Sequence, residues 1–103
     1  MEEQNLAAIM GLIIHGGDAK SNAMEAIQAA KEGNFVEADE KIKQAETALT
    51  EAHHSQTGLL TKEAQGDHME VTLLTVHSQD HLMTSIAFTD LAKEIIAVYK
   101  KIG

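Results

Sequence analysis

Three titratable side chains, His77, Asp80 and His81, fall within five residues of one apolar segment of the chain. In a helix, residues three and four positions apart lie side by side, so these groups would share one patch of its surface. Apolar residues recur at helical spacing on the same lines, which indicates that the patch does not face open solvent. Polar groups in such a place need partners, and the pattern therefore favours a functional site.

His77 has the chemistry of a nucleophile if one of its ring nitrogens is held by a hydrogen bond, because the other then carries a fixed lone pair. It can take up a phosphoryl group and release it, while His81, one turn later, donates a hydrogen bond to the phosphoryl oxygens. Gln79 points to another flank of the helix, from which its amide could reach an incoming partner. These three residues are the candidate catalytic groups.

Two other interpretations of the histidine pair stay open on the residues alone. The histidines could be packed in a helix interface, each satisfied by a backbone carbonyl or water, or they could bind Zn²⁺ or Ni²⁺ adventitiously. A functional zinc site usually has a third clear ligand, and the HExxH pattern is absent because Asp80 directly precedes His81. The remaining histidines are expected to be structural or exposed, namely His15, His53, His54 and His68.

Composition restricts the class of protein. The 103 residues are expected to form one domain, residues 1–103, with an aliphatic core because aromatic residues make up only 3%. The formal charge is −8 and all eight cations are Lys, so a basic protein surface is a better partner than nucleic acid. There is no cysteine, no apolar run of membrane-spanning length and no basic, apolar leader after Met1. We therefore expect a cytoplasmic protein without membrane insertion.

The chain contains no proline, and glycines mark the ends of the expected helices instead. Gly33 suits the left-handed position after a helix, Asn34 suits the N-cap of the next helix, and Glu37 completes a capping box. The same pattern recurs over residues 66–70. It predicts three helices, each about 45 Å long, at Glu3–Glu32, Phe35–Gln65 and His68–Lys101.

Short connections place consecutive helices antiparallel, so the expected fold is all-α, an up-down-up three-helix bundle. The apolar stripes are Leu6, Ile9, Ile13, Ala23, Ile27 and Ala30 in the first helix, and Phe35, Ala38, Ile42, Ala45, Leu49, Ala52, Gln56 and Leu59 in the second. Gly16 and Gly17 interrupt the first stripe, which predicts a kink or a close backbone approach, with a full break as the alternative. The third helix carries two apolar stripes, and the second of them needs a partner subunit.

Asp80 lies on the stripe that is expected to face other subunits. In a cyclic assembly its copies would approach one another, and like-charged carboxylates in a low-dielectric interior repel unless a cation intervenes. Mg²⁺, which prefers oxygen ligands, is one solution, and a protonated or water-bridged carboxylate cluster is the other.

Three ordered motifs make the chain resemble a known family. They are Gly-Asp-Ala-Lys-Ser-Asn-Ala-Met-Glu-Ala-Ile-Gln-Ala-Ala-Lys-Glu-Gly-Asn-Phe at residues 17–35, Ala-His-His-Ser-Gln-Thr-Gly-Leu-Leu at residues 52–60, and Val-His-Ser-Gln-Asp-His-Leu-Met-Thr at residues 76–84. With these motifs the whole chain resembles the IIA component of the lactose/cellobiose (also chitobiose) class of the bacterial phosphoenolpyruvate-dependent sugar phosphotransferase system (PTS). Thr75 and Ser78 depart slightly from the pattern, where an apolar residue and Ala are more usual, and neither affects a motif role.

The resemblance implies a three-helix subunit that assembles as a homotrimer, a nine-helix bundle. It implies that His77 is phosphorylated at Nε2, that His81 lies near the phosphoryl group, and that three copies of Asp80 bind one Mg²⁺ on the threefold axis. It also implies that the phosphocarrier protein HPr donates the phosphoryl group and that a cysteine of the IIB component accepts it. The IIB component then phosphorylates a β-linked disaccharide that enters through the membrane component IIC.

Two rival functions stay open beside this one. A non-catalytic helical oligomer, acting as a scaffold or regulatory module, explains the stripes and the charge but not the shared position of Asp80 and the two histidines. A degenerate family member that binds a regulator without transferring phosphate is the other, and the intact motif argues against it. The identity of the sugar cannot be read from the chain, because a IIA component does not contact sugar.

Overall fold

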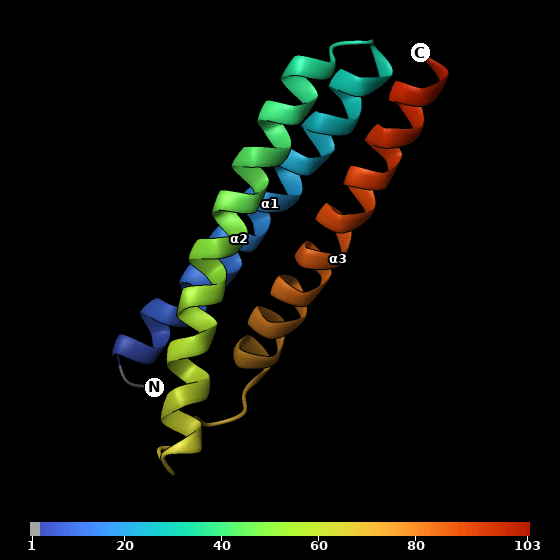
Figure 1. The fold of residues 1–103 in the computed structure, drawn as a ribbon. Coiled ribbons are helices and arrows are strands. Elements are labelled where there is room, and N and C mark those ends of the chain that lie inside the picture. The colour runs from blue at the N-terminus through green and yellow to red at the C-terminus, as the bar shows by residue number, and fades with distance from the viewer. Residues whose placement is uncertain (1–2) are drawn as a thin grey trace.

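The computed structural model describes residues 3–103, which form three helices: α1 (Glu3–Lys31), α2 (Phe35–Ala64) and α3 (Leu73–Ile102). They run up, down and up along a rod that measures 52 × 20 × 19 Å (Figure 1). No strand occurs within residues 3–103, so the prediction of an all-α antiparallel three-helix bundle is confirmed. Met1 and Glu2, from which the absence of a leader is partly inferred, lie outside the described residues.

None of the three helices has the length and apolar character that crossing a bilayer requires, over the part of the chain that the structure describes.

The α1–α2 connection follows the predicted pattern in its backbone. Gly33 adopts a φ of +83°, and the Asn34 N–H donates to the Ala29 carbonyl at 2.9 Å, which closes the end of α1. The predicted capping box is wrong, because Asn34 has a ψ of 72° and its side chain makes no cap hydrogen bond.

The start of the third helix is the main correction to the predicted fold. The sequence predicts a start at His68, whereas α3 begins at Leu73 and Thr72 is its N-cap. The Thr72 side chain accepts a hydrogen bond from the Thr75 N–H at 3.2 Å. Residues 67–72 are needed to carry the chain from the end of α2 across to α3, so His68 precedes the helix and His77 lies at the start of its second turn.

Alanine makes up most of the core because α1 packs against both other helices at close range. The larger buried cluster contains Ala19, Ala23, Ala26, Ala29, Ala30, Ala38, Ile42, Ala45, Ala48, Ala92 and Ile96. A smaller cluster of Leu12, Ala52 and Leu82 lies toward the other end of the bundle. The predicted α2 stripe is confirmed, since its members are buried or half-buried, whereas Leu6 of the predicted α1 stripe is exposed.

The glycine pair, Gly16 and Gly17, does not break α1, which runs without interruption from Glu3 to Lys31. The alternative of two shorter helices is therefore wrong. The predicted close approach is confirmed at Gly16, which is buried and faces α3.

Candidate functional site

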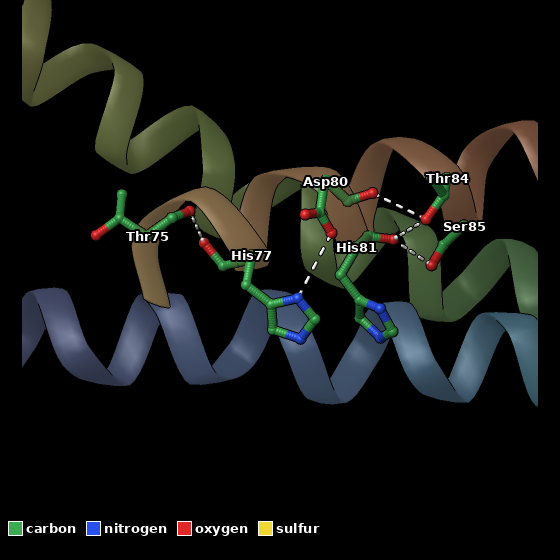
Figure 2. Close-up of polar contacts among 7 residues, drawn as sticks. Thr75, His77, Asp80, His81, Thr84 and Ser85 are labelled. Atoms are coloured by element: carbon green, nitrogen blue, oxygen red, sulfur yellow. Dashed lines mark hydrogen bonds and ion pairs between the residues drawn. The ribbon is translucent and has the colours of Figure 1, made fainter. Parts of the chain in front are cut away.

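The second turn of α3 brings His77, Asp80 and His81 onto one side of the helix, as their spacing predicts (Figure 2). The two imidazoles project to the same side, and their ring centroids lie 5.6 Å apart with the planes tilted by 35°. The His77 side chain is 54% exposed and that of Asp80 is 62% exposed. The expectation that the patch avoids solvent is thus wrong for the single chain, and His77 is accessible to a second protein.

Asp80 lies beside the inner nitrogen of His77. The distance from His77 Nδ1 to Asp80 Oδ1 is 3.6 Å, which is longer than a hydrogen bond and within the range of an ion pair. Nε2 lies at the far end of the ring, away from the carboxylate (Figure 2). If Nδ1 keeps its proton on the carboxylate side, Nε2 is the nitrogen that carries the free lone pair.

His81 is half-buried and is held from two sides. The Ser85 hydroxyl lies 2.6 Å from the His81 carbonyl oxygen and 2.9 Å from the Gly16 carbonyl oxygen on α1, so its single proton is shared between them. Thr84 Oγ1 also donates to the His81 carbonyl at 3.2 Å. The backbone around His81 is therefore tied to α1 through one buried serine.

Sequence reasoning missed Ser85. The available signal was the side of α3 that packs against the rest of the chain, where three of the six buried residues are polar. The six are Ser78, Leu82, Ser85, Thr89, Ala92 and Ile96. Of these polar residues, Ser85 donates to the Gly16 carbonyl of α1, whereas Ser78 donates to the Thr75 carbonyl of its own helix. The sequence pattern therefore indicated close helix contact without singling out Ser85.

Gln79 lies on a different flank of α3, as predicted. Its Oε1 accepts a hydrogen bond at 2.9 Å from Gln56 Nε2 of α2, and the side chain is half-buried. The structure thus places Gln79 at the α2–α3 contact, apart from the two imidazoles.

The surface next to His77 is apolar. Leu73, Leu74 and Val76 line a shallow open depression that ends at His77 and Asp80. Exposed apolar side chains continue along the same helix to its last turn, namely Leu73, Val76, Met83, Leu91, Ile95, Val98 and Ile102. A protein partner could contact His77 and bury apolar surface at the same time.

The sequence profile of the family described as "PTS system, Lactose/Cellobiose specific IIA subunit" matches residues 7–100. The chain belongs to this family. It is 49% identical over 102 residues to the lichenan-specific phosphotransferase enzyme IIA component of Bacillus subtilis, covering 99% of this chain and 93% of that protein. The resemblance stated from the three motifs is therefore confirmed.

Solved structures of other IIA proteins have the same fold. The cellobiose-specific enzyme IIA of Bacillus anthracis superposes with a TM-score of 0.95 at 45% identity, covering 99% of this chain and 94% of that one. The chitobiose IIA of Escherichia coli, solved in complex with HPr, gives a TM-score of 0.83 at 41% identity, covering 99% and 98%. Membership of the family gives this chain a general role in phosphotransferase sugar transport.

The residues that the structure describes form no complete metal site within the single chain. Among residues 3–103, no group of three or more His, Asp or Glu side chains is placed to hold an ion. Asp80 offers carboxylate oxygens, which are the right donors for a hard cation, on the exposed apolar side of α3. The donor chemistry thus fits Mg²⁺, and the other ligands would have to come from outside this chain.

The remaining histidines lie apart from this patch. His53 and His54 are exposed on α2, His15 is half-buried on α1, and His68 Nδ1 lies 3.8 Å from Glu63 Oε1, with both side chains exposed. This agrees with the expectation that they are structural or exposed.

Proposed function

We propose that this chain is the phosphoryl carrier of a bacterial sugar phosphotransferase system and that His77 Nε2 carries the phosphoryl group. The observation that carries the proposal is the exposed His77 ring, which has Asp80 beside Nδ1 and leaves Nε2 free. Phosphoryl transfer between two proteins requires a positioned nucleophile and in-line geometry and little else from the accepting chain.

Each of the two phosphoryl transfers forms one bond to phosphorus and breaks another. The His77 Nε2 lone pair forms a bond to phosphorus while the nitrogen–phosphorus bond of phospho-HPr breaks and its electron pair returns to the donor nitrogen. In the second transfer, a cysteine thiolate of the IIB component forms a sulfur–phosphorus bond, and the Nε2–phosphorus bond breaks with its electron pair returning to His77. His81 donates a hydrogen bond to the phosphoryl oxygens while the group resides on His77.

HPr is proposed as the donor because the chitobiose IIA of Escherichia coli, which shares the fold and 41% of its residues, was solved in complex with HPr. The charge of this chain supports the same class of partner. Its net charge of −8 and lack of Arg favour a partner that supplies the cations around the transferred group.

The imported sugar is proposed to be a β-linked disaccharide of the lactose, cellobiose or chitobiose type, because similar IIA proteins are named for lichenan, cellobiose and lactose. Phosphoenolpyruvate is the first donor of such a system, so the chain is proposed to act in the cytoplasm with the IIB component as acceptor.

The working form is proposed to be a homotrimer, a nine-helix bundle, in which the exposed apolar side of α3 is covered by other copies. Asp80 lies on that side between Val76 and Met83, so three copies would meet near the threefold axis. Mg²⁺ held by these carboxylates would offset their mutual repulsion, and its role would be in assembly.

The test is intact-protein mass spectrometry after incubation with phosphoenolpyruvate, enzyme I and HPr at neutral to alkaline pH. We expect one acid-labile phosphoryl adduct per chain in the wild type and none in His77→Gln, because Gln has no nucleophilic ring nitrogen. His54→Gln, which removes an exposed histidine of α2, should keep the adduct. Equal melting curves would show that all three proteins are folded, and an adduct on His77→Gln would contradict the assignment.

The rival function is a non-catalytic helical oligomer, and the uncovered apolar side of α3 favours it equally. It predicts assembly without any adduct. A wild-type protein that stays unmodified beside HPr shown to be phosphorylated would therefore favour the scaffold or regulatory role.

A further inference from the structure

Two adjacent glycines in the middle of a long helix require an explanation. Each Gly destabilises a helix interior by roughly 1 kcal/mol relative to Ala, yet α1 continues through Gly16 and Gly17 without a break. Neither glycine has the positive φ that would demand its use, since positive values occur only at Gly33 and Gly66 among the described residues. The glycine pair is therefore required by the side chains packed against it and not by its own backbone conformation.

The glycine pair faces His81. A Cβ atom on Gly16 would lie 3.1 Å from His81 Cδ2 and 3.1 Å from Ser85 Oγ, both tighter than ordinary contact. A Cβ atom on Gly17 would lie 3.4 Å from His81 Nε2, at the edge of ordinary contact. Figure 2 shows the His81 ring extending from α3 across α1. Because glycine has no side chain, Gly16 and Gly17 leave room for the His81 imidazole against α1.

The Ser85 hydroxyl connects α1 and α3 at the point where Gly16 faces His81. Its hydroxyl bridges the Gly16 and His81 carbonyl oxygens at 2.9 and 2.6 Å, and the residue is fully buried. A larger side chain at position 16 would have to displace both the ring and this bridge. The ring and the backbone of His81 are thus set by the same point of α1.

We infer that Gly16 and Gly17 are positioning residues that hold the His81 imidazole against α1 with its Nε2 open beside the His77 ring. The effect on transfer rests on the proposed function, in which His81 donates a hydrogen bond to the phosphoryl group on His77. A methyl group on Gly17 would contact the donating nitrogen itself, whereas one on Gly16 would press on the ring edge.

Gly58 supplies a matched control within the same chain. It lies in α2, is exposed, and a Cβ atom there would meet nothing within 4 Å. Gly58→Ala therefore changes helix propensity alone. Gly17→Ala makes the same chemical change and adds only the contact with His81 Nε2.

The experiment compares Gly17→Ala, Gly58→Ala and wild type by thermal melting, by the rate of phosphoryl acceptance from phospho-HPr, and by ¹⁵N NMR of the imidazoles without phosphate. Both variants should melt at or above the wild-type temperature, because Ala favours helix. Only Gly17→Ala should shift the His81 ring nitrogen signals. Its acceptance rate should fall by about tenfold to a hundredfold, the range expected for a displaced hydrogen-bond donor.

Gly16→Ala is the second variant. It should shift the His81 signals further than Gly17→Ala does, because its Cβ atom would lie closer to the His81 ring. If it melts well below wild type, Gly17→Ala alone decides the matter.

Wild-type signals and a wild-type rate in Gly17→Ala would overturn the inference, as would shifted His81 signals with an unchanged rate or an equal loss of rate in Gly58→Ala. Failure of the wild type to accept phosphate would instead overturn the proposed function, and the NMR comparison would still decide whether the glycine pair positions the ring.

Discussion

At the residue scale, two imidazoles of the same chemical type lie 5.6 Å apart in different surroundings. His77 is more than half exposed beside a carboxylate, while His81 is half-buried against the glycine pair and Ser85. In the proposed carrier, exposure suits the group that receives and passes on the phosphoryl group, and packing suits the group that keeps a fixed position beside it. Their environments therefore support a nucleophile at His77 and a hydrogen-bond donor at His81.

Thr89 is a residue whose side chain is not matched to its surroundings. It is 1% exposed, and its Oγ1 has no hydrogen-bond partner among the residues that the structure describes. Thr89→Val keeps the shape and removes the unpaired hydroxyl, so we expect a gain of about 1 kcal/mol in the free energy of unfolding by urea denaturation. Thr50→Val, whose hydroxyl is exposed and donates to the Glu46 carbonyl, should show no such gain. A less stable Thr89→Val would contradict the assignment of an unpaired hydroxyl.

At the element scale, α2 and α3 share the smallest contact of the three helix pairs, and surface ion pairs connect them. Lys93 Nζ lies 3.0 Å from Glu46 Oε2, and Lys100 Nζ lies 2.8 Å from Asp39 Oδ1. The hydrogen bond from Lys93 to Glu46 raises the pKa of Lys93 above its ordinary value, so the lysine in this exposed ion pair is fully charged at neutral pH. The position of α3 depends mainly on its contact with α1, where the candidate site lies.

The N-cap of α3 lies five residues before His77 and should affect both stability and site order. Thr72→Val removes the oxygen that accepts from the Thr75 N–H, so we expect a loss of about 1 kcal/mol in urea unfolding. Thr72→Ser retains a hydroxyl and should recover most of that loss. Hydrogen exchange of the first α3 turns should be faster in Thr72→Val alone. Equal stability of the two variants would show that the cap hydrogen bond contributes little.

At the scale of the whole molecule, the exposed apolar side of α3 and the acidic charge have different consequences. The apolar side favours self-association, while a net charge of −8 on each of several copies opposes it unless the charges lie outward. Asp80 is the exception, since its carboxylate lies on the apolar side itself.

Asp80→Leu should therefore strengthen the proposed trimer in the absence of metal. The substitution removes three like charges from the shared surface and adds apolar contact. Light scattering after size-exclusion should give a trimer mass for both proteins, and a chelator should lower the melting temperature of wild type but not of Asp80→Leu. A monomer mass for wild type would refute the trimer, and a chelator-insensitive wild type would refute the metal.

The fold was largely predictable because its signals are local. Glycines at positions 33 and 66, the absence of proline and the three- and four-residue apolar spacing specify three helices without reference to distant residues. The start of α3 was not predictable from these signals, because two polar residues, Asp67 and Thr72, could each cap a helix. Which of them does so depends on the path that the chain takes from α2 to α3.

The sequence by itself determined the helical class, the grouping of His77, Asp80 and His81, and the family, because each depends on residue types at short spacing. Only the tertiary structure decided which ring is packed and which is free. That difference arises from residues more than sixty positions away, where α1 presents two glycines and a carbonyl to His81 and Ser85. Helical periodicity specifies the face of a helix that a residue occupies, and only the packing of the chain specifies what that face meets.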